Sequence, residues 1–347
     1  MPLLNDYVLV GCTMIPNDEN TIFIADGNGE VLKTFPTSAN SHIYPTMTVQ
    51  NTLQEDKYVY FDDVIVKDVD GNVLTSFEAK SLNHECIFGS NMPRYYTPGF
   101  DYSTANDNVL AIVSEIKYDE KISKHELLEN AIVEYDFNGN VIWKWNVSEH
   151  YDQLGLTEEE KLDFYENDLR VSGFEEGNDY CHMNSACVVG PNKWYDAGDE
   201  RFNPNNIICC SRHMSRIFII EKETGDVVYV MDCRDFDIIH QHYAHVIPEG
   251  IDGAGNILLF HGHSKTPCFI EINPISNEVV FKHEGNFRTN GMGSVQKMPD
   301  GKYLVGCSLK RKVTIVDNKH NEEDIQLPQV FYRINAYPRS WVANYLN

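Results

Sequence analysis

The hydrophobic and polar positions along the chain repeat as short strand pairs joined by polar turns. Five segments carry the pattern clearly and the last carries it weakly: FIADGNGEVLKTF (23–35), VKDVDGNVLTSF (66–77), VEYDFNGNVIWKW (133–145), IEKETGDVVYVM (220–231), IEINPISNEVVFK (270–282) and VDNKHNEEDIQL (316–327). Alternating β-branched and aromatic residues flank turns rich in Asp, Asn and Gly, which tolerate the backbone geometry of tight hairpins. The pattern therefore predicts six β-hairpins.

Each hairpin belongs to a larger repeating unit. An apolar strand precedes most of the hairpins, as in NVLAIVSE, NIICCSR and KYLVGCS, and a further strand-like segment such as HMNSACVVG or QHYAHVIP lies upstream of it. A unit of about four strands has the size of one propeller blade. Six such units in 347 residues predict an all-β protein, a six-bladed β-propeller that forms a single domain over residues 1–347.

Three longer segments interrupt the middle blades, and we interpret them as insertions at 114–130, 148–181 and 191–206. In the second of these, Thr157 and Glu160 have the spacing of a capping box before KLDFYENDL, which predicts a short helix. Long loops on a rigid scaffold often line or cover a functional site. The alternative is that they are surface loops without a role.

Composition narrows the range of partners and compartments. The formal net charge is −24, which excludes nucleic acid and anionic membranes as natural partners because both repel an acidic surface. No apolar run approaches the ~20 residues of a membrane span. We recognise no signal peptide, and the nine cysteines lack a CxxC pair, so we expect a cytoplasmic protein with reduced, buried thiols. The sequence leaves a homodimer open.

Histidines concentrate in the fifth unit. IIHQHYAHVIPEG places His240, His242 and His245 within six residues, and His261 and His263 follow in LLFHGHSK. Strand alternation predicts that His240 and His242 share one face while His245 takes the other, and that His261 and His263 share a face. Imidazoles also bind Zn, Cu, Fe or Ni, so a metal site on His240, His242, His261 and His263 is one alternative.

In a propeller, the innermost strands bring polar residues from several blades to one channel mouth. The corresponding segments offer His182 and Asn184 in the fourth unit, His240 and His242 in the fifth and Thr289 in the sixth. The neighbouring strand of the fourth unit adds Ser211 and Arg212. A group such as His182, Arg212 and His242 is positive and rich in hydrogen-bond donors, which suits a small oxyanion.

At these residues the chain resembles the arylsulfate sulfotransferase family, whose nucleotide-independent members are six-bladed propellers. The resemblance rests on VEYDFNGNVIWKW, on HMNSACVV with NIICCSRHMSRIFIIEKETGDVVY, and on QHYAHVIPEG followed by GNILLF. It implies that His242 is the nucleophile and that His182, Asn184 and Arg212 bind the sulfate and stabilise its charge. FYRINAYP resembles a family segment that returns a tyrosine, here Tyr332, to the site.

The family usually carries a histidine pair, H-H-D, on an earlier blade. The segment that we align with it, YYTPGFDYSTANDNVLAIV, has Thr97, Pro98 and Gly99 there, which leaves Tyr95, Tyr96 and His84 as candidates for the missing group. Our predicted catalytic residues are His242, His182 and Arg212, and the predicted substrate-binding residues are Asn184, Ser211, His240, His261, Tyr96, Thr289 and Tyr332.

The predicted reaction is transfer of a sulfuryl group from a phenolic sulfate ester to a phenolic acceptor through a sulfo-histidine, with no cofactor and no metal. Such a transfer passes through a loose transition state whose charge Arg and His donors stabilise. Two alternatives use the same scaffold. One is a polysaccharide lyase or hydrolase in which Arg212 neutralises a uronate carboxylate. The other is a binding propeller without catalysis.

Overall fold

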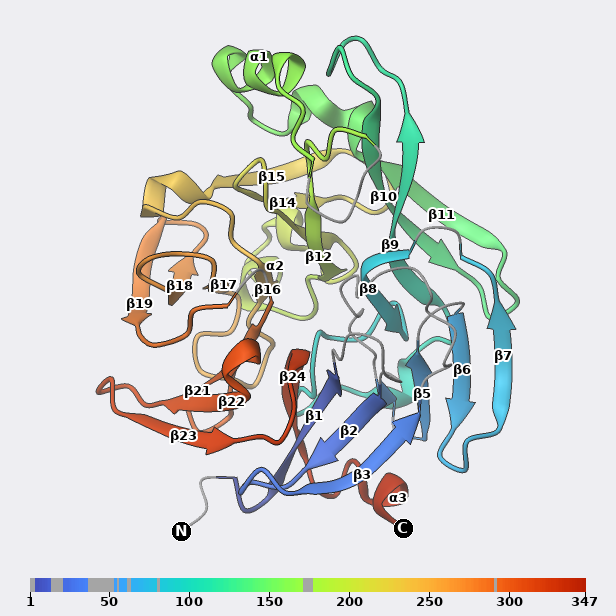
Figure 1. Ribbon diagram of the computed structural model, residues 1–347, viewed down its shortest axis with the longest axis vertical. Helices are drawn as coiled ribbons and strands as arrows, with labels where there is room; N and C mark the ends of the chain where they lie inside the picture. The colour runs from blue at the N-terminus through green and yellow to red at the C-terminus, as the bar shows by residue number, and fades with distance from the viewer. Residues whose placement is uncertain are drawn as a thin grey trace.

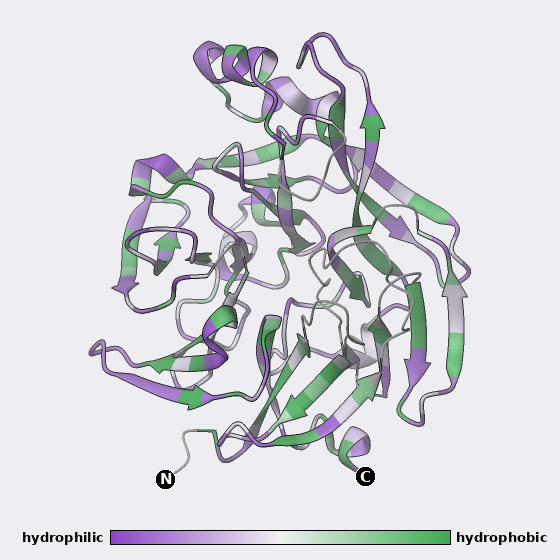
Figure 2. Cartoon of the chain, in the orientation of Figure 1, coloured by the Kyte–Doolittle hydropathy of each residue, from purple (hydrophilic) through white to green (hydrophobic). Residues whose placement is uncertain are grey.

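The computed structural model describes residues 4–13, 21–36, 53–54, 56–60, 64–79, 82–170, 177–289 and 292–347. These residues form six four-stranded antiparallel sheets arranged in a ring, a six-bladed β-propeller (Figure 1). The predicted fold class is therefore confirmed. Figure 2 shows hydrophobic residues concentrated in the strands and hydrophilic residues along the connecting loops and the outer helix α1. In the described part of the chain, no helix is long and apolar enough to cross a membrane.

Both ends of the chain contribute to the first blade, whose strands run from the centre outwards as β24 (Phe331–Pro338), β1 (Tyr7–Thr13), β2 (Thr21–Ala25) and β3 (Val31–Pro36). Blades two and three contain, in the same order, β4 (Leu53–Gln54), β5 (Lys57–Tyr60), β6 (Val64–Asp68) and β7 (Val73–Phe77), then β8 (Leu82–Phe88), β9 (Val109–Lys117), β10 (Leu127–Tyr135) and β11 (Val141–Asn146). Pairing of β24 with β1 closes the ring.

The remaining blades follow in chain order. Blade four contains β12 (Met183–Val188), β13 (Ile207–Ser211), β14 (Arg216–Ile220) and β15 (Val227–Asp232). Blade five contains β16 (Tyr243–Val246), β17 (Ile257–His261), β18 (Cys268–Asn273) and β19 (Glu278–Glu284). Blade six contains β20 (Ser294–Lys297), β21 (Tyr303–Cys307), β22 (Lys312–Val316) and β23 (Glu322–Gln326).

The predicted hairpins are the third and fourth strands of each blade, and their turns explain the repeated sequence. In the third blade, the Asp136 carboxylate accepts the backbone N–H groups of Asn138 at 2.9 Å and Asn140 at 2.8 Å. Gly139 has φ +85°, a left-handed conformation that costs glycine little. Asp68 holds its own turn in the same way. These local bonds fix the hairpin register independently of the core.

Burial falls from the middle of each blade to its rim. Every residue of β13 (IICCS) and β14 (RIFII) is buried, so these strands read as continuous apolar runs. The outermost strand β19 (EVVFKHE) is exposed at most positions. The apolar faces of neighbouring blades therefore pack on each other, while the outer strands meet solvent.

Short helices occupy the connections. They are η1 (Tyr102–Thr104), η2 (Val147–Gln153), α1 (Glu158–Glu166), α2 (Lys193–Asp196), η3 (Glu200–Phe202), η4 (Cys233–Phe236), η5 (Ser308–Lys310) and α3 (Ala343–Leu346). The predicted helix is α1, and its capping box between Thr157 and Glu160 is present. Residues 114–130 form the long ends of β9 and β10 with their connection. Part of the 148–181 insertion, residues 171–176, lies outside the described residues.

Candidate active site

The innermost strands bring four aromatic side chains together at one mouth of the central channel. His84 lies in β8, Tyr332 in β24, and His182 and His242 immediately before β12 and β16. All four are buried, with exposed fractions of 0, 0, 5 and 2% respectively. The rings of His84 and His182 lie 4.7 Å apart, and those of His242 and Tyr332 lie 5.5 Å apart. Residues from four blades thus share one pocket.

Hydrogen bonds fix the protonation of two of these histidines. Nδ1 of His242 lies 3.3 Å from the carbonyl oxygen of Gly293, which only accepts, so Nδ1 carries the hydrogen and Nε2 keeps a lone pair. The Tyr332 hydroxyl, 3.2 Å away, therefore donates to His242 Nε2. Its oxygen then accepts from His84 Nδ1 at 3.0 Å. This leaves His84 Nε2 as a lone pair with no hydrogen-bond partner among the described residues.

Both histidines are neutral near pH 7. Burial lowers the pKa of His242 well below 6.5, and the charges of Arg333, His182 and Arg212 act in the same direction. Burial likewise lowers the pKa of His84, assisted by the nearby His182 and His242. A neutral imidazole with a free lone pair is a competent nucleophile at neutral pH.

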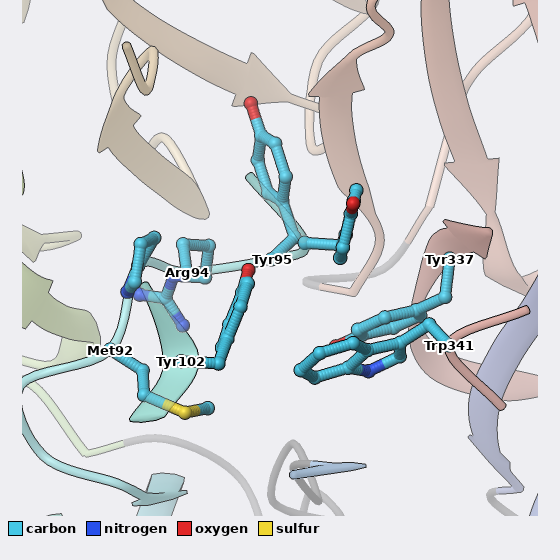
Figure 3. A pocket seen from close by; sticks show the side chains of 8 residues that line it. Met92, Arg94, Tyr95, Tyr102, Tyr337 and Trp341 are labelled. Carbon is cyan, nitrogen blue, oxygen red and sulfur yellow. The ribbon is translucent and has the colours of Figure 1, made fainter. Parts of the chain in front are cut away.

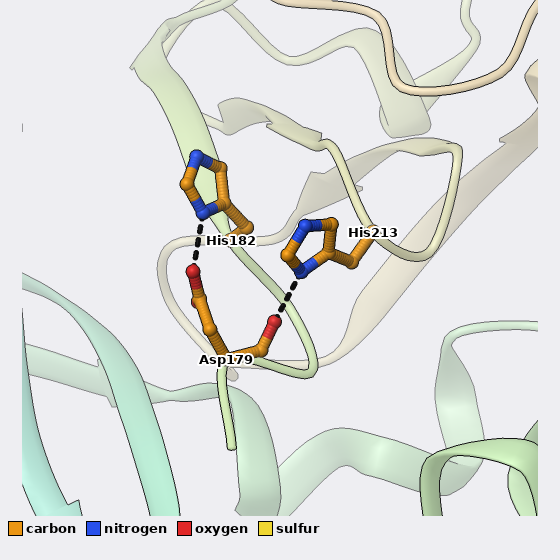
Figure 4. Close-up of side chains that lie close together, drawn as sticks. All are labelled: Asp179, His182 and His213. Carbon is orange, nitrogen blue, oxygen red and sulfur yellow. Dashed lines mark hydrogen bonds and ion pairs between the residues drawn. The ribbon is translucent and has the colours of Figure 1, made fainter. Parts of the chain in front are cut away.

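Asp179 organises the adjoining side of the pocket (Figure 4). Its carboxylate accepts from Nδ1 of His182, and its backbone carbonyl accepts from Nδ1 of His213. The Arg212 guanidinium in turn donates to Nε2 of His213. Burial and the charge of His182 lower the pKa of His213 to about 4, so its ring is neutral.

These three residues are also the described group best placed to hold a metal ion, because their ligand atoms lie within 4.8 Å of one another. However, both imidazole nitrogens that face Asp179 already donate hydrogen bonds to it, and the second nitrogen of His213 accepts from Arg212. The hydrogen bonds account for the cluster without an ion. We assign no metal to it.

A buried ionic network lies beneath the histidines. The Glu85 carboxylate pairs with Arg333 at 2.9 Å and with Arg94 at 2.8 Å, and it accepts the backbone N–H of Ala186 at 2.7 Å. The ring of Tyr243 lies 5.0 Å from the Arg94 guanidinium and 4.8 Å from that of Arg333. After burial, the charge of Arg333 is the largest influence that lowers the pKa of His242, and a positive charge so close to this ring favours an anionic occupant.

Other predicted site residues have structural partners near the pocket. The Ser211 hydroxyl donates to the Cys181 carbonyl at 2.6 Å. The Thr289 hydroxyl donates to the Met292 carbonyl, and the Thr289 backbone N–H donates to the Gly262 carbonyl at 3.0 Å. Asn184 is fully buried and donates to the Gln241 carbonyl at 3.3 Å. These contacts hold the loops around the histidines.

The histidine-rich segment departs from simple strand alternation. Strand β16 begins only at Tyr243, and His240 has φ +59°, so His240 and His242 are not on one strand face. His240 is half-buried against His213, at 5.9 Å between ring centroids. His245 does point elsewhere, to the Tyr95 hydroxyl at 3.1 Å. His261 is buried at the end of β17, whereas His263 lies beyond the strand and is exposed.

Tyr96 lies apart from the histidines. It packs with Tyr102 and Trp341, at 5.8 and 5.5 Å between ring centroids. Tyr96 lines a small pocket together with Tyr102, Trp341 and Tyr337, and Figure 3 shows the last three rings. Tyr337 lies at the far end of β24 from Tyr332. The pocket holds about 10 Å³, room for roughly one water molecule. The structure therefore does not bring Tyr96 to the other predicted residues.

His84 lies on the innermost strand of an earlier blade, where the sequence comparison found no equivalent of the family's H-H-D histidine pair. The innermost strand of blade three is β8, and the connection 89–108 separates it from β9. This connection contains Thr97, Pro98 and Gly99, so the segment that we aligned with the family's histidine pair lies outside the innermost strand, whereas the candidate His84 lies in it. Asp179 was missed, although it lies three residues before His182, close enough to bond its ring. A histidine next to an acid in NHEC, residues 83–86, was the available signal for His84.

A groove of about 860 Å³ lies between helix α1 and the side chains of His213 and His240. His213 and His240 line one part of it, and Arg234 and Asp232 another. The face of α1 that lines the groove carries residues at helical spacing, Glu159, Leu162, Asp163 and Glu166. The lining includes five carboxylates and one guanidinium, so the groove is acidic although the pocket beside it is positive.

Comparisons with known proteins concern the fold and the family of the chain. The structure resembles a protein of unknown function from Bacteroides caccae, with a TM-score of 0.52 and 12% identity over 95% of this chain and 98% of that chain. It also resembles the β-propeller domain of Myceliophteria thermophila Cps50 (Swd1), with a TM-score of 0.49 and 9% identity over 90 and 81% of the two chains. At such identity these likenesses concern the fold alone.

The sequence has no significant match among curated proteins. A family model does match it over residues 16–236, a range that includes His84, Asp179, His182 and Arg212 and ends before His242. The matching family is described as arylsulfotransferase (ASST). The match spans more than half of the chain, and the chain belongs to the arylsulfotransferase (ASST) family.

Proposed function

We propose that the protein transfers a sulfuryl group from a phenolic sulfate ester to a phenolic acceptor, with His242 as the intermediate carrier. The observation that carries this proposal is the state of His242. Its Nε2 holds a lone pair inside a buried pocket, and the adjoining Arg212 and the Arg94–Glu85–Arg333 network favour an anion. Family membership supports the same reaction class.

In the first step, His242 Nε2 attacks the sulfur of the aryl sulfate. The N–S bond forms while the bond from sulfur to the phenol oxygen breaks, and the departing phenoxide takes a proton from His182. Arg212 stabilises the charge on the non-bridging oxygens. Tyr332, whose hydroxyl covers Nε2 before the donor binds, turns its O–H to one of those oxygens.

In the second step, the acceptor phenol enters after the first phenol leaves. Its oxygen attacks the sulfur while its proton passes to the now neutral His182. The N–S bond breaks, and His242 returns to its neutral state with the lone pair on Nε2. The two steps balance without any cofactor, and each has a lower barrier than direct transfer between two phenols.

The decisive test is intact-mass spectrometry after incubation with 4-nitrophenyl sulfate and no acceptor. We expect an adduct with the mass of one sulfuryl group and a burst of 4-nitrophenol, both lost in His242→Asn. His245→Asn is the matched control, because His245 is also a buried histidine of this segment but contacts Tyr95 instead. Equal nitrophenol release by wild type and His242→Asn would exclude the proposal.

Charge argues against the alternative substrate, a long uronate polymer. Such a chain would extend from the pocket through the groove beside α1, where five carboxylates face one guanidinium. Carboxylates of a polyuronate would be repelled along that path. A small aryl sulfate places its single negative group in the positive pocket and avoids this conflict.

A further inference from the structure

The Asp179 side chain has the features of a dedicated partner for His182. It is 2% exposed, and its carboxylate accepts a hydrogen bond from Nδ1 of His182. Its other carboxylate oxygen, Oδ1, has no hydrogen-bond partner among the described residues. A carboxylate this deeply buried is stable only if it is paired, because desolvation of an isolated charge is costly.

Elementary hydrogen-bond chemistry fixes the state of His182. The Asp179 carboxylate only accepts, so Nδ1 of His182 must carry a hydrogen. Nε2 is then either a lone pair, in the neutral ring, or a donor, in the imidazolium. His182 can donate to a sulfate oxygen or to a leaving phenoxide only as the imidazolium. Whatever stabilises that cation therefore decides whether His182 can act as the acid.

One group that faces His182, the Arg212 guanidinium, opposes the cation by its charge, and the neutral rings beside it offer no compensating charge. His84 approaches from β8, His213 lies 4.9 Å away between ring centroids, and Arg212 and His242 are within electrostatic range. Of these neighbours, only Asp179 is negative. Burial by itself would raise the pKa of Asp179, but the charge and N–H of His182 outweigh burial and lower it. The Asp179 carboxylate is therefore ionised, and its hydrogen bond to His182 compensates for its burial.

We infer that Asp179 is a positioning residue for the transfer, which orients His182 with Nε2 available to the pocket and holds it as the imidazolium that protonates the departing phenoxide. This inference rests on the proposed function for its catalytic meaning. The arrangement follows the logic of an acid that orients and stabilises a catalytic histidine without itself exchanging a proton. The backbone carbonyl of Asp179 also accepts a hydrogen bond from His213 and so fixes that ring. The fixed ring in turn accepts the hydrogen bond from Arg212.

Side-chain ¹⁵N NMR of histidine-labelled protein tests the physical part of the inference without any substrate. In wild type we expect His182 to carry a hydrogen on Nδ1 and to keep its second proton near neutral pH. In Asp179→Asn we expect His182 to lose that proton at a pH at least one unit lower. His213 should keep its hydrogen on Nδ1 near neutral pH, because its acceptor is the backbone carbonyl, and this serves as an internal check on folding.

Steady-state kinetics test the catalytic part. We expect Asp179→Asn to lower kcat at pH 7 at least tenfold with little change in KM, and to recover rate at lower pH as His182 regains its proton. Asp179→Glu, which restores the charge, should recover part of kcat. Glu129→Gln is the control, because Glu129 is a buried carboxylate that accepts hydrogen bonds from Tyr180, the neighbour of Asp179, and from the backbone of Ser148.

The possible results separate the two proposals. If wild type forms no sulfuryl adduct, the proposed function fails, while the NMR comparison still decides whether Asp179 controls His182. If the adduct forms but Asp179→Asn leaves both the His182 titration and kcat unchanged, the role of Asp179 is excluded. A parallel loss of kcat in Glu129→Gln with normal His182 spectra would also exclude it, since the effect would then be structural.

Discussion

The Tyr332 hydroxyl lies 3.2 Å from Nε2 of His242, the atom that would carry the sulfuryl group. This phenol belongs to β24, the strand that pairs with β1 and so joins the two ends of the propeller. The last strand of the chain thus both closes the ring and supplies the neighbour of the proposed nucleophile. Ring closure and site assembly are therefore coupled in this fold.

Tyr332→Phe should lower kcat for 4-nitrophenol release by about 10- to 100-fold, because it removes one donor aimed at developing charge. We expect the variant to remain folded, since only the hydroxyl is lost. Tyr337→Phe is the matched control, as it makes the same change on the same strand at the opposite channel mouth. Equal losses in both variants would show that the effect is not specific to the site.

Buried histidines should make the protein less stable as the pH falls below about 6.5. The pKa values of His84, His242 and His245 lie well below 6.5 in the folded state because the rings are buried, whereas the unfolded chain binds protons near 6.5. Below that pH the unfolded state binds more protons, so the free energy of unfolding falls by about 1.4 kcal/mol per pH unit for each such histidine.

Thermal unfolding followed by circular dichroism at pH 7.5, 6.5 and 5.5 measures this loss of stability at acidic pH. The wild-type Tm should change little between the first two values and fall at the third. The Tm of His245→Gln should fall less steeply with decreasing pH, because this variant lacks one of the titrating histidines. A wild-type Tm that stays constant down to pH 5.5 would contradict the assignment of neutral, buried histidines.

The fold could be predicted from the sequence because its repeating signal is local. A turn such as Asp136–Asn140 makes its own hydrogen bonds, so the residues that encode each hairpin are adjacent in the chain. The innermost strands lack such a signal when a long connection separates them from their hairpins. Blade three has such a connection at 89–108, which is why β8 and His84 were assigned to no blade.

The site could be predicted only in part, for a related reason. His182, Arg212, His242 and Tyr332 were recognised and do lie close together, because equivalent positions of equivalent repeats converge on one axis. Tyr96 was misplaced, since it entered through the wrong alignment of residues 89–108. Asp179 was missed because its role depends on a hydrogen bond to a neighbouring ring, and an isolated Asp before a strand carries no periodic pattern.

Glu160 should be important for the stability of α1, and through it for one wall of the groove. It completes the capping box with Thr157, at 2.8 Å from its N–H, and pairs with the buried Arg216 at 3.0 Å. We expect Glu160→Ala to lower the free energy of unfolding by about 2 kcal/mol, since a cap is lost and a buried cation keeps fewer partners. Urea denaturation measures this change.

The neighbouring residue provides the control. Glu159→Ala changes an exposed residue of the same helix turn and should cost less than about 0.5 kcal/mol. If both variants lose the same stability, the contacts of Glu160 are not what holds α1. Limited proteolysis should cut Glu160→Ala, but not Glu159→Ala, faster than wild type within the segment that contains α1.

The acidic groove should make the protein prefer acceptor phenols that carry a positive charge. Glu159, Asp163 and Glu166 line it from α1, beside Leu162, whose side chain is 60% exposed and offers an apolar surface to an aromatic ring or alkyl chain. We expect kcat/KM for tyramine to exceed that for 3-(4-hydroxyphenyl)propionate by about 5-fold, as a few partly screened charges are worth about 1 kcal/mol.

The double variant Glu159→Gln, Asp163→Asn should narrow this difference, and added salt should narrow it in wild type because exposed charges are screened. Phenol itself has no charged substituent and should be transferred equally by both proteins, which separates a change in selectivity from a change in catalysis. Equal kcat/KM for the two charged acceptors in wild type would mean that they reach the His242 pocket by a path that avoids α1.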